Sequence, residues 1–293
     1  MENNAKTTLV LGANGKTGSR VTKKMEALKL SVRRGSRTAE PKFDWEDKST
    51  WENALEGISS VYITFQPDLA VEGSEESIAA FVKQAAKAGV QKLVLLSGRG
   101  EPEAQRCEQI VIDSGLKWTI VRASWFSQNF SESYFLEPIQ AGYVALPVAE
   151  VKEPFVDADD IADVVVASLI EEGHDFKCYE VTGPRLLTFK EAIAEIAQAT
   201  NRTIQYVDLP LNVYTAQLRE YQVPEEIIGL ISYLFTEVLD GRNAYTVHGI
   251  EEALGRKPKD FTEYVKETLA SNVWVLEQSD GRDAAFETGN CPG

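Results

Sequence analysis

Residues 7–18 read Thr7-Thr8-Leu9-Val10-Leu11-Gly12-Ala13-Asn14-Gly15-Lys16-Thr17-Gly18, and this stretch decides the fold of the chain. A run typical of a buried strand passes directly into three spaced glycines, and a helical pattern with Val21, Met25 and Leu28 on one face follows. Glycines let a backbone approach a diphosphate, and a helix N-terminus offers it free N–H groups and a positive dipole end. The stretch therefore predicts a dinucleotide-binding turn. Its expected contacts are Gly12, Asn14, Gly15, Lys16, Thr17 and Gly18.

Two other interpretations of the glycines have to be weighed. Three glycines alone are also compatible with a simple tight turn. Gly15-Lys16-Thr17 resembles the end of a P-loop, but that motif needs a glycine five residues before its last glycine, and Val10 stands there. The sequence therefore excludes a P-loop and favours the dinucleotide site over a simple turn.

Short apolar runs alternate with helical patterns through the first 170 residues. The runs 61–65, 93–96 and 118–121 have the length of strands, and a helical pattern that includes Ile78 and Phe81 ends at Gly89. Continuous apolar strands between helices are typical of a parallel sheet covered on both faces. We predict an α/β fold with a doubly wound parallel sheet, the Rossmann fold.

The end of the second predicted strand indicates which cofactor the turn binds. NAD-binding sites of this kind carry an acidic residue about 20 positions after the first glycine, where it binds the ribose 2′-hydroxyl. Here Arg33, Arg34 and Arg37 occupy the region without a carboxylate, and a planar guanidinium can bind a 2′-phosphate through two hydrogen bonds. We predict NADP(H), with a solvated basic strand end as the alternative. Asp44 is expected to bind the adenine amino group, whereas Trp45 is equally compatible with the core.

The pattern becomes richer in helices in the second half of the chain. Asp157 is expected to cap one helix, and Thr188 with Glu191 forms a capping box before another. A very apolar helix is expected from Pro224 to Leu239, with burial in the core favoured over a partner surface. We predict an NADP-binding Rossmann core over residues 6–182, a smaller helix-rich region over 183–275 that closes a substrate cleft, and a disordered tail over 276–293.

Composition excludes several functional classes. Lys and Arg number 30 against 45 Asp and Glu, giving a net charge of −15, which argues against nucleic-acid binding because that needs a clustered basic face. Three cysteines without a CxxC pair and two histidines predict neither a disulfide scaffold nor a metal site. No signal peptide or apolar run of about 18 residues is present. We expect a soluble, cytoplasmic protein that does not bind membranes.

The chain resembles the NmrA-like branch of the atypical short-chain dehydrogenase/reductases up to about Val275. The resemblance rests on residues 12–18 and 95–98, on 114–122 followed by 125–126 and 129–130, on 154–162, and on Gly255-Arg256-Lys257-Pro258. Within that branch, Gly15-Lys16-Thr17 and Phe43-Asp44-Trp45 are similar to the festuclavine- and agroclavine-type reductases of ergot alkaloid assembly.

The resemblance implies an NADP-binding sheet and a small-molecule cleft beside it. It implies that the nicotinamide side is lined by Thr64, Phe65, Gln66, Pro67, Ser97 and Gly98. It implies that the substrate cleft is walled by Trp125, Phe126, Asn129 and Phe130. An aromatic cluster of that kind is also compatible with a purely structural core.

One departure from the family pattern concerns catalysis. Short-chain dehydrogenases normally use Tyr-x-x-x-Lys for proton transfer, yet none of the ten tyrosines here has a lysine four residues later. The catalytic residues therefore stay unassigned; the candidate proton donors are Tyr134, Glu108, Cys107 and Arg99.

Two functions are compatible with this pattern. The first is an NADPH-dependent reductase that delivers hydride to an electrophilic small molecule such as an iminium, a quinone or an activated double bond. The second is a regulatory protein that senses NADP(H) without catalysis and binds a protein partner. We favour the reductase.

Overall fold

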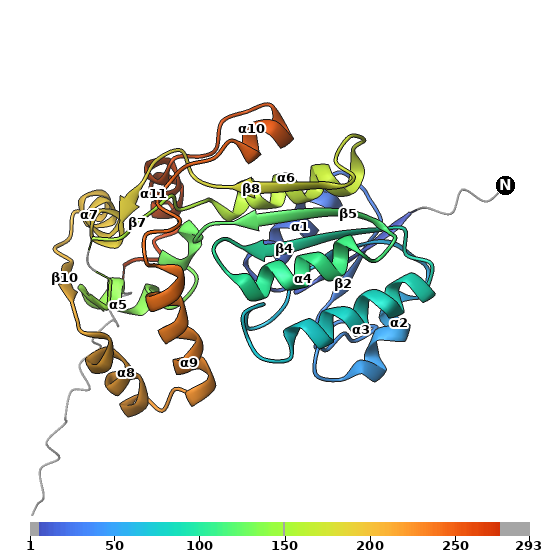
Figure 1. Cartoon of the computed structure of the whole chain (residues 1–293). Coiled ribbons are helices and arrows are strands. Elements are labelled where there is room, and N and C mark those ends of the chain that lie inside the picture. The colour runs from blue at the N-terminus through green and yellow to red at the C-terminus, as the bar shows by residue number, and fades with distance from the viewer. Residues whose placement is uncertain (1–5, 149, 276–293) are drawn as a thin grey trace, which may run out of the picture.

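The computed structural model describes residues 6–148 and 150–275, which form a large α/β unit and a smaller unit beside it (Figure 1). The large unit contains a six-stranded parallel sheet with the strand order β2-β1-β3-β4-β5-β8. Its strands are β1 (Thr7–Leu11), β2 (Val32–Gly35), β3 (Ile58–Ile63), β4 (Lys92–Gly98), β5 (Lys117–Ala123) and β8 (Lys177–Val181). The predicted tail, 276–293, lies outside the described residues.

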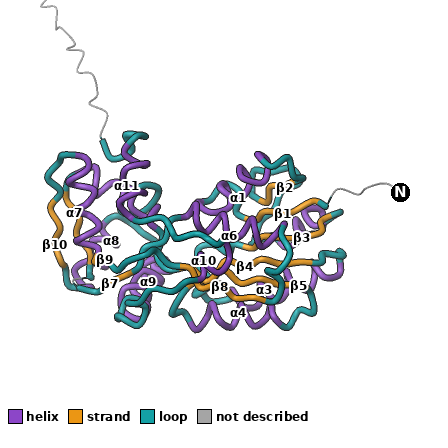
Figure 2. Tube along the Cα trace, turned by 90° about the horizontal axis from the view of Figure 1, so that it is seen from above, coloured by secondary structure: helices purple, strands orange, loops and turns teal. Residues whose placement is uncertain are grey.

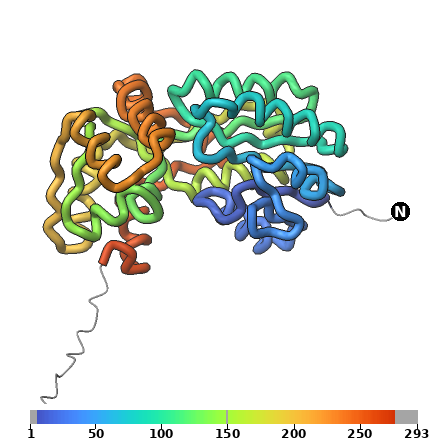
Figure 3. Tube along the Cα trace, turned by 90° about the horizontal axis from the view of Figure 1, so that it is seen from below, coloured from blue at the N-terminus to red at the C-terminus, as the bar shows by residue number. Residues whose placement is uncertain are grey.

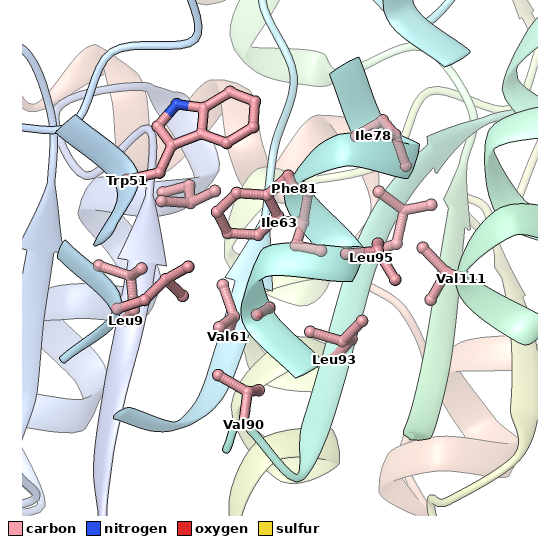
Figure 4. Close-up of a cluster of buried hydrophobic side chains, with 14 of the residues drawn as sticks. Leu9, Trp51, Val61, Ile63, Ile78, Phe81, Val90, Leu93, Leu95 and Val111 are labelled. Carbon is pink, nitrogen blue, oxygen red and sulfur yellow. The ribbon is translucent and has the colours of Figure 1, made fainter. Parts of the chain in front are cut away.

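Helices cover both faces of this sheet (Figure 2). The helices of the large unit are α1 (Lys16–Ala27), α2 (Trp51–Leu55), α3 (Ser74–Lys87), α4 (Pro102–Ile112), α6 (Ala158–Ile170) and α10 (Gly249–Leu254), with a 3-10 turn η1 (Lys48–Thr50). One hydrophobic core packs the sheet against α2, α3 and α4, and it includes Leu9, Trp51, Phe81 and Leu95 (Figure 4). A second core packs the opposite face against α1, α6 and α10. The predicted doubly wound α/β fold is confirmed.

The strand order creates a crevice at one edge of the sheet. β1 pairs in parallel with β2 on one side and with β3 on the other, so the direction of the crossovers reverses between β1 and β3. Ligands of such sheets bind beyond the carboxyl ends of the strands at this reversal. The glycine turn after β1 and the segment after β3 therefore meet at the same place.

The smaller unit lies beside the sheet and gathers segments from the middle and the C-terminal part of the chain (Figure 3). It has a hydrophobic core of its own, rich in phenylalanine. Its elements are η2 (Ser127–Phe130), α5 (Leu136–Ala141), β6 (Tyr143–Leu146), β7 (Lys152–Glu153), β9 (Leu187–Thr188), α7 (Phe189–Thr200), β10 (Gln205–Asp208), α8 (Leu211–Glu220), α9 (Glu225–Tyr233), η3 (Leu234–Val238) and α11 (Phe261–Leu269). This core draws on residues before and after the division predicted at residue 183, because Phe130 and Phe155 pack against Phe189 and Phe261. After η3 the chain returns to the sheet with α10.

Local capping signals are found where the sequence predicts them. The Asp157 side chain accepts a hydrogen bond from the Asp159 N–H at the start of α6, and Thr188 forms the capping box of α7 with Glu191. The apolar helix after Pro224 begins as expected, but a π-helical turn, η3, replaces regular α-helix after Tyr233. The wider turn places Phe235 and Val238 against the body of the protein, where both are buried.

Within residues 6–148 and 150–275, no helix is long and apolar enough to cross a membrane. In the same part of the chain, His, Cys, Asp and Glu side chains form no group of three or more that could hold a metal ion.

Candidate functional site

A cavity of about 320 Å³ lies at the carboxyl ends of β1, β3, β4 and β5, and the smaller unit closes it. Its walls bring together most of the predicted site residues. These are Gly12, Gly15, Lys16, Thr17, Thr64, Phe65, Gln66, Pro67, Ser97, Gly98, Trp125, Phe126 and Asn129. Residues of the predicted cofactor turn and of the predicted substrate wall therefore line the same cavity.

Close backbone packing determines the shape of the glycine turn. Gly12 has φ +61, and a Cβ there would stand 2.3 Å from Thr64 Oγ1, which itself donates to the Leu11 carbonyl at 3.1 Å. A Cβ on Gly18 would stand 2.2 Å from the Gly12 carbonyl oxygen. The turn is therefore compatible only with glycine at both positions.

The middle glycine has a different role from its neighbours. Gly15 caps the N-terminus of α1 with ordinary extended dihedral angles, φ −83 and ψ 177, and its N–H donates to the Gly12 carbonyl at 2.8 Å. A Cβ at Gly15 would lie 3.2 Å from that carbonyl oxygen, on a residue that lines the cavity. The open N-terminus of α1 beside residues without side chains fits a diphosphate group.

The three arginines have different surroundings in the structure. Arg33 donates to the carbonyls of Asn53, Ala54 and Glu56 at the end of α2 at 3.4, 3.0 and 2.6 Å. Arg34 pairs with Glu26 on α1 at 2.9 Å. Arg37 is exposed, and among the described residues no hydrogen bond or ion pair of its side chain is found. The nearby Asn14 amide donates to Thr38 Oγ1 at 3.2 Å. None of these residues lines the cavity, so their predicted cofactor contacts stay predictions.

Asp44 and Phe130 also lie outside the cavity walls. Asp44 pairs with Lys42 at 3.1 Å, and its predicted bond to adenine is not tested. Trp45 belongs to an aromatic cluster with Phe43 and Phe81, and its Nε1 donates to the Thr64 carbonyl at 3.0 Å. Phe130 is fully buried in the core of the smaller unit, behind the aromatic wall of the cavity. Its side chain therefore supports that wall.

Two carboxyl groups that the sequence analysis did not identify face each other in the cavity. Glu101 follows β4 and Asp68 follows β3, and their side chains are hydrogen-bonded. Burial raises the pKa of both groups, and the neighbouring Asp68 carboxylate raises the pKa of Glu101 further. The Glu101 carboxyl occupies the space beside Gly98, because a Cβ on Gly98 would stand 2.3 Å from Glu101 Oε1. The pair therefore holds a proton at neutral pH.

Glu153, on β7, is a third cavity carboxyl. Its side chain is 0% exposed, and neither carboxylate oxygen has a hydrogen-bond partner among the described residues. Burial raises the pKa of Glu153 from its ordinary 4.5 to about 8, although the positive charge of Arg99 opposes that shift. Nothing in the sequence distinguishes this glutamate, because only the fold places β7 at the cavity.

A network of charged and polar side chains adjoins the cavity, and its members Ser97 and Arg99 line the cavity wall. The Ser97 hydroxyl donates to Glu108 at 2.6 Å, and Arg122 also binds Glu108. Arg99 pairs with Glu180 at 2.7 Å and lies over the Tyr245 ring, 4.4 Å from its centroid. These charged groups are therefore paired with one another within the protein.

The four candidate proton donors can now be compared. Glu108 and Arg99 belong to the charge network, and only Arg99 of these two lines the cavity. Cys107 is buried outside the cavity, and its burial raises the pKa of the thiol to about 11. Tyr134 lines the cavity but is 65% exposed, with Lys16 Nζ 5.9 Å from its ring centroid. None of the four is a buried residue that lines the cavity with a polar group free of other partners.

Comparison with known proteins agrees with this geometry. A family model described as NAD(P)H-binding matches residues 12–172. Agroclavine dehydrogenase of Claviceps fusiformis is 27% identical over 289 residues, which cover 92% of this chain and 99% of that protein. NAD(P)H azoreductase of Xenophilus azovorans is 27% identical over 286 residues, which cover 90% and 98% respectively. The similarity to ergot alkaloid reductases predicted from the sequence is confirmed.

A solved structure shares the fold. The NADPH-dependent quinone oxidoreductase of Escherichia coli, in complex with NADPH, matches with a TM-score of 0.75 at 18% identity, and the match covers 90% of this chain and 99% of that chain. At this identity the similarity shows the fold alone, and it agrees with the parallel sheet described above.

The raised pKa of Glu153 predicts a pH dependence of stability. Between 4.5 and about 8 the folded chain retains a proton that the unfolded chain has released, so the contribution of Glu153 to the free energy of unfolding falls as the pH rises. Glu153→Gln should remove up to about 1.4 kcal/mol per pH unit from that slope. Urea unfolding over this pH range measures it. The exposed Glu172→Gln should keep the slope of the parent, and parallel curves for parent and Glu153→Gln would contradict the assignment.

Proposed function

The chain belongs to the NAD(P)H-binding family, and from that premise we propose that it is an NADPH-dependent reductase of the atypical short-chain dehydrogenase type, acting on an electrophilic small molecule. The observation that carries this proposal is that the predicted cofactor residues and an apolar wall line one and the same cavity. Its walls join the glycine turn and the segments after β3 and β4 to apolar side chains of α9 and η3, including Ile231 and Phe235. Such a cavity has room for a reactive group of the cofactor and an acceptor side by side.

The residues of the turn and of β3 and β4 suit the parts of the cofactor. Gly12, Gly15 and the N-terminus of α1 would hold the diphosphate, and Arg37 is the arginine with a guanidinium free for the 2′-phosphate. Thr64 to Pro67, with Ser97 and Gly98, would line the nicotinamide side. When bound, NADPH would supply a hydride to the acceptor. The protein's own part is to orient both reactants and to exclude water.

The absence of the usual Tyr-x-x-x-Lys pair bears on the class of acceptor. No tyrosine of the chain is followed by a lysine four residues later, so the usual proton-transfer pair is missing. Hydride transfer to an electron-poor centre, such as an iminium or a quinone, depends more on positioning than on a strong general acid. Such acceptors therefore suit this site better than simple ketones.

The regulatory alternative has less support. The apolar helix that could have been a partner surface instead lines the cavity with Ile227, Leu230 and Ile231. The curated relatives named above are a dehydrogenase and an azoreductase. Within the described residues, no feature favours a protein partner over a small-molecule acceptor.

Turnover tests the proposal directly. NADPH oxidation, followed by absorbance, should appear with at least one iminium, quinone or enone acceptor. Trp125→Ala should lower kcat/KM at least about tenfold while the Kd for NADPH stays unchanged, because Trp125 lines the acceptor side of the cavity. The control is Tyr221→Ala, at an aromatic residue that is 81% exposed and outside the cavity. A complete absence of turnover across the panel would refute a reductase.

Cofactor selectivity should depend on Arg37. We expect the parent chain to bind NADPH at least about tenfold more tightly than NADH, a difference of ~1.4 kcal/mol. Arg37→Ala should remove most of this difference by weakening NADPH alone, because NADH has no 2′-phosphate. Calorimetric titration with both cofactors measures it, with the exposed Arg219→Ala as a charge-matched control. If the parent chain bound NADPH and NADH equally tightly, the arginines would have no role in binding the 2′-phosphate.

The glycine turn gives a separate test of cofactor binding. Gly15→Val should reduce NADPH affinity by at least about tenfold while changing the free energy of unfolding by less than about 1 kcal/mol. The reason is that the dihedral angles of Gly15 suit any residue and its Cβ would meet the Gly12 carbonyl oxygen at 3.2 Å, a contact that a shift of a few tenths of an ångström relieves, whereas the valine side chain would occupy space needed by the diphosphate. Gly229→Val, at a helical position with no atom within 4 Å of the added Cβ, is the control. Unchanged binding by the Gly15 variant would show that the turn is only structural.

A further inference from the structure

The Glu101 side chain is directed into the cavity and not toward its own helix. Glu101 is the N-cap residue of α4, yet its side chain makes no capping hydrogen bond. The carboxyl group lies against Gly98 instead, since a Cβ on that glycine would overlap with both carboxyl oxygens. Gly98 is one of the residues proposed above to line the nicotinamide side. The Glu101 carboxyl therefore lies where hydride transfer is proposed to take place.

Asp68, in the segment after β3, supplies the second carboxyl group of a pair. Its Oδ1 accepts the Ala70 N–H at 2.8 Å, and its side chain is hydrogen-bonded to that of Glu101. Two carboxyl groups share a hydrogen bond only when one of them is protonated. A backbone N–H stabilises an ionised carboxylate, so Asp68 is the acceptor and Glu101 holds the proton. Both residues line the cavity, where Glu101 is 7% exposed and Asp68 is half-buried, so the pair has access to that space.

The groups packed around the pair favour retention of this proton. Burial raises the pKa of Glu101 to about 9, and the negative charge of Asp68 contributes to that rise. Glu103 and Glu108 on α4 act in the same direction. From α9, the Tyr233 hydroxyl donates to Glu103 at 2.7 Å. The pair therefore stays singly protonated at neutral pH.

The cations beside the pair have partners of their own. Arg99 pairs with Glu180 at 2.7 Å, and Arg242 pairs with Asp240 at 2.8 Å. In the part of the chain that the structure describes, neither carboxyl group of the pair forms an ion pair. The proton is thus not displaced by a nearby positive charge.

Other ionisable side chains of the cavity suit proton donation less well. Glu153 is kept neutral by burial, but both of its oxygens are covered by protein atoms and cannot reach an acceptor. Lys16 lies at the N-terminus of α1, where the diphosphate is proposed to bind, and its Nζ is 5.9 Å from the ring centroid of Tyr134. Tyr134 itself is 65% exposed. The pair, by contrast, combines a retained proton with access to the cavity.

We propose that the Asp68–Glu101 pair is the proton donor of this site and takes the place of the missing Tyr-x-x-x-Lys. The inference rests on the proposed reductase function, and it concerns neutral conjugated carbonyl acceptors, which need a proton as well as a hydride. A pair of this kind titrates as one unit, so the proton belongs to both groups together. Two carboxyl groups that share a proton can serve as a general acid in a site of low polarity.

The proposed step balances as follows for an enone. Hydride addition to the β-carbon forms a C–H bond, breaks the C=C π bond and leaves an electron pair on the carbonyl oxygen. The acceptor is thereby reduced and the nicotinamide oxidised. An O–H bond then forms on that oxygen while the O–H bond of Glu101 breaks. The pair is left as two carboxylates that repel each other, and it regains one proton from solvent.

Infrared difference spectroscopy tests the proton without any turnover. The full chain, without cofactor, is titrated from about pH 6 to about pH 10.5, and the carbonyl band of protonated carboxyl groups is followed. Up to about pH 9 the parent should show a band that Glu101→Gln lacks. Asp68→Asn should lose this band at least about one pH unit earlier, because the neighbouring negative charge is gone. Glu172→Gln, at an exposed residue outside the cavity, should match the parent.

Kinetics tests transfer of the proton to an acceptor. With NADPH and either chalcone or naphthoquinone, kcat/KM of the parent should fall by up to about tenfold per pH unit above about pH 9. Glu101→Gln still donates a hydrogen bond to Asp68 but has no proton to transfer. It should lower kcat/KM at least about hundredfold and remove the pH dependence, while the Kd for NADPH changes less than about twofold. Glu172→Gln should keep the profile of the parent.

The contradicting results are distinct for the inference and for the function. A parent without a Glu101-dependent band at neutral pH would overturn the inference, and so would full activity of Glu101→Gln with either carbonyl acceptor. If Glu101→Gln does not fold, an alkaline limit that fails to move in Asp68→Asn refutes the inference. Turnover of iminium acceptors alone would refute it and leave the reductase function intact. A chain that shows the band but never oxidises NADPH with any acceptor would refute the function itself.

Discussion

The site depends on one close contact, between the Gly12 carbonyl and the backbone of Gly18. A Cβ on Gly18 would stand 2.2 Å from that oxygen, so the first turn of α1 can approach the end of β1 only because residue 18 has no side chain. Thr64, directly after β3, completes the arrangement, because its hydroxyl donates to the Leu11 carbonyl and fills the space beside Gly12. This contact sets the direction of α1, and with it the position of the open helix N-terminus that faces the cavity.

The second constraint is the aromatic core of the smaller unit. Phe130, Phe155 and Phe189 pack against one another, and they join the segment after β5 to residues that follow Phe130 by 25 and 59 positions. Trp125 and Phe235 attach to this core from the cavity side. Because the same core holds η3, it also fixes the apolar helix α9 that precedes η3 over the carboxyl edge of the sheet.

The sequence predicted the features that depend on local chemistry. The strand–turn–helix around Gly12, the caps at Asp157 and Thr188, and the parallel sheet all follow from short patterns, and the structure contains each of them. It could not predict the partners of Arg33 and Arg34, because the α2 carbonyls and Glu26 become neighbours only through folding. Glu153 is a further feature that the sequence could not predict. Its isolation results from β7 pairing with β9 beside the cavity, and no residue near it in sequence signals that pairing.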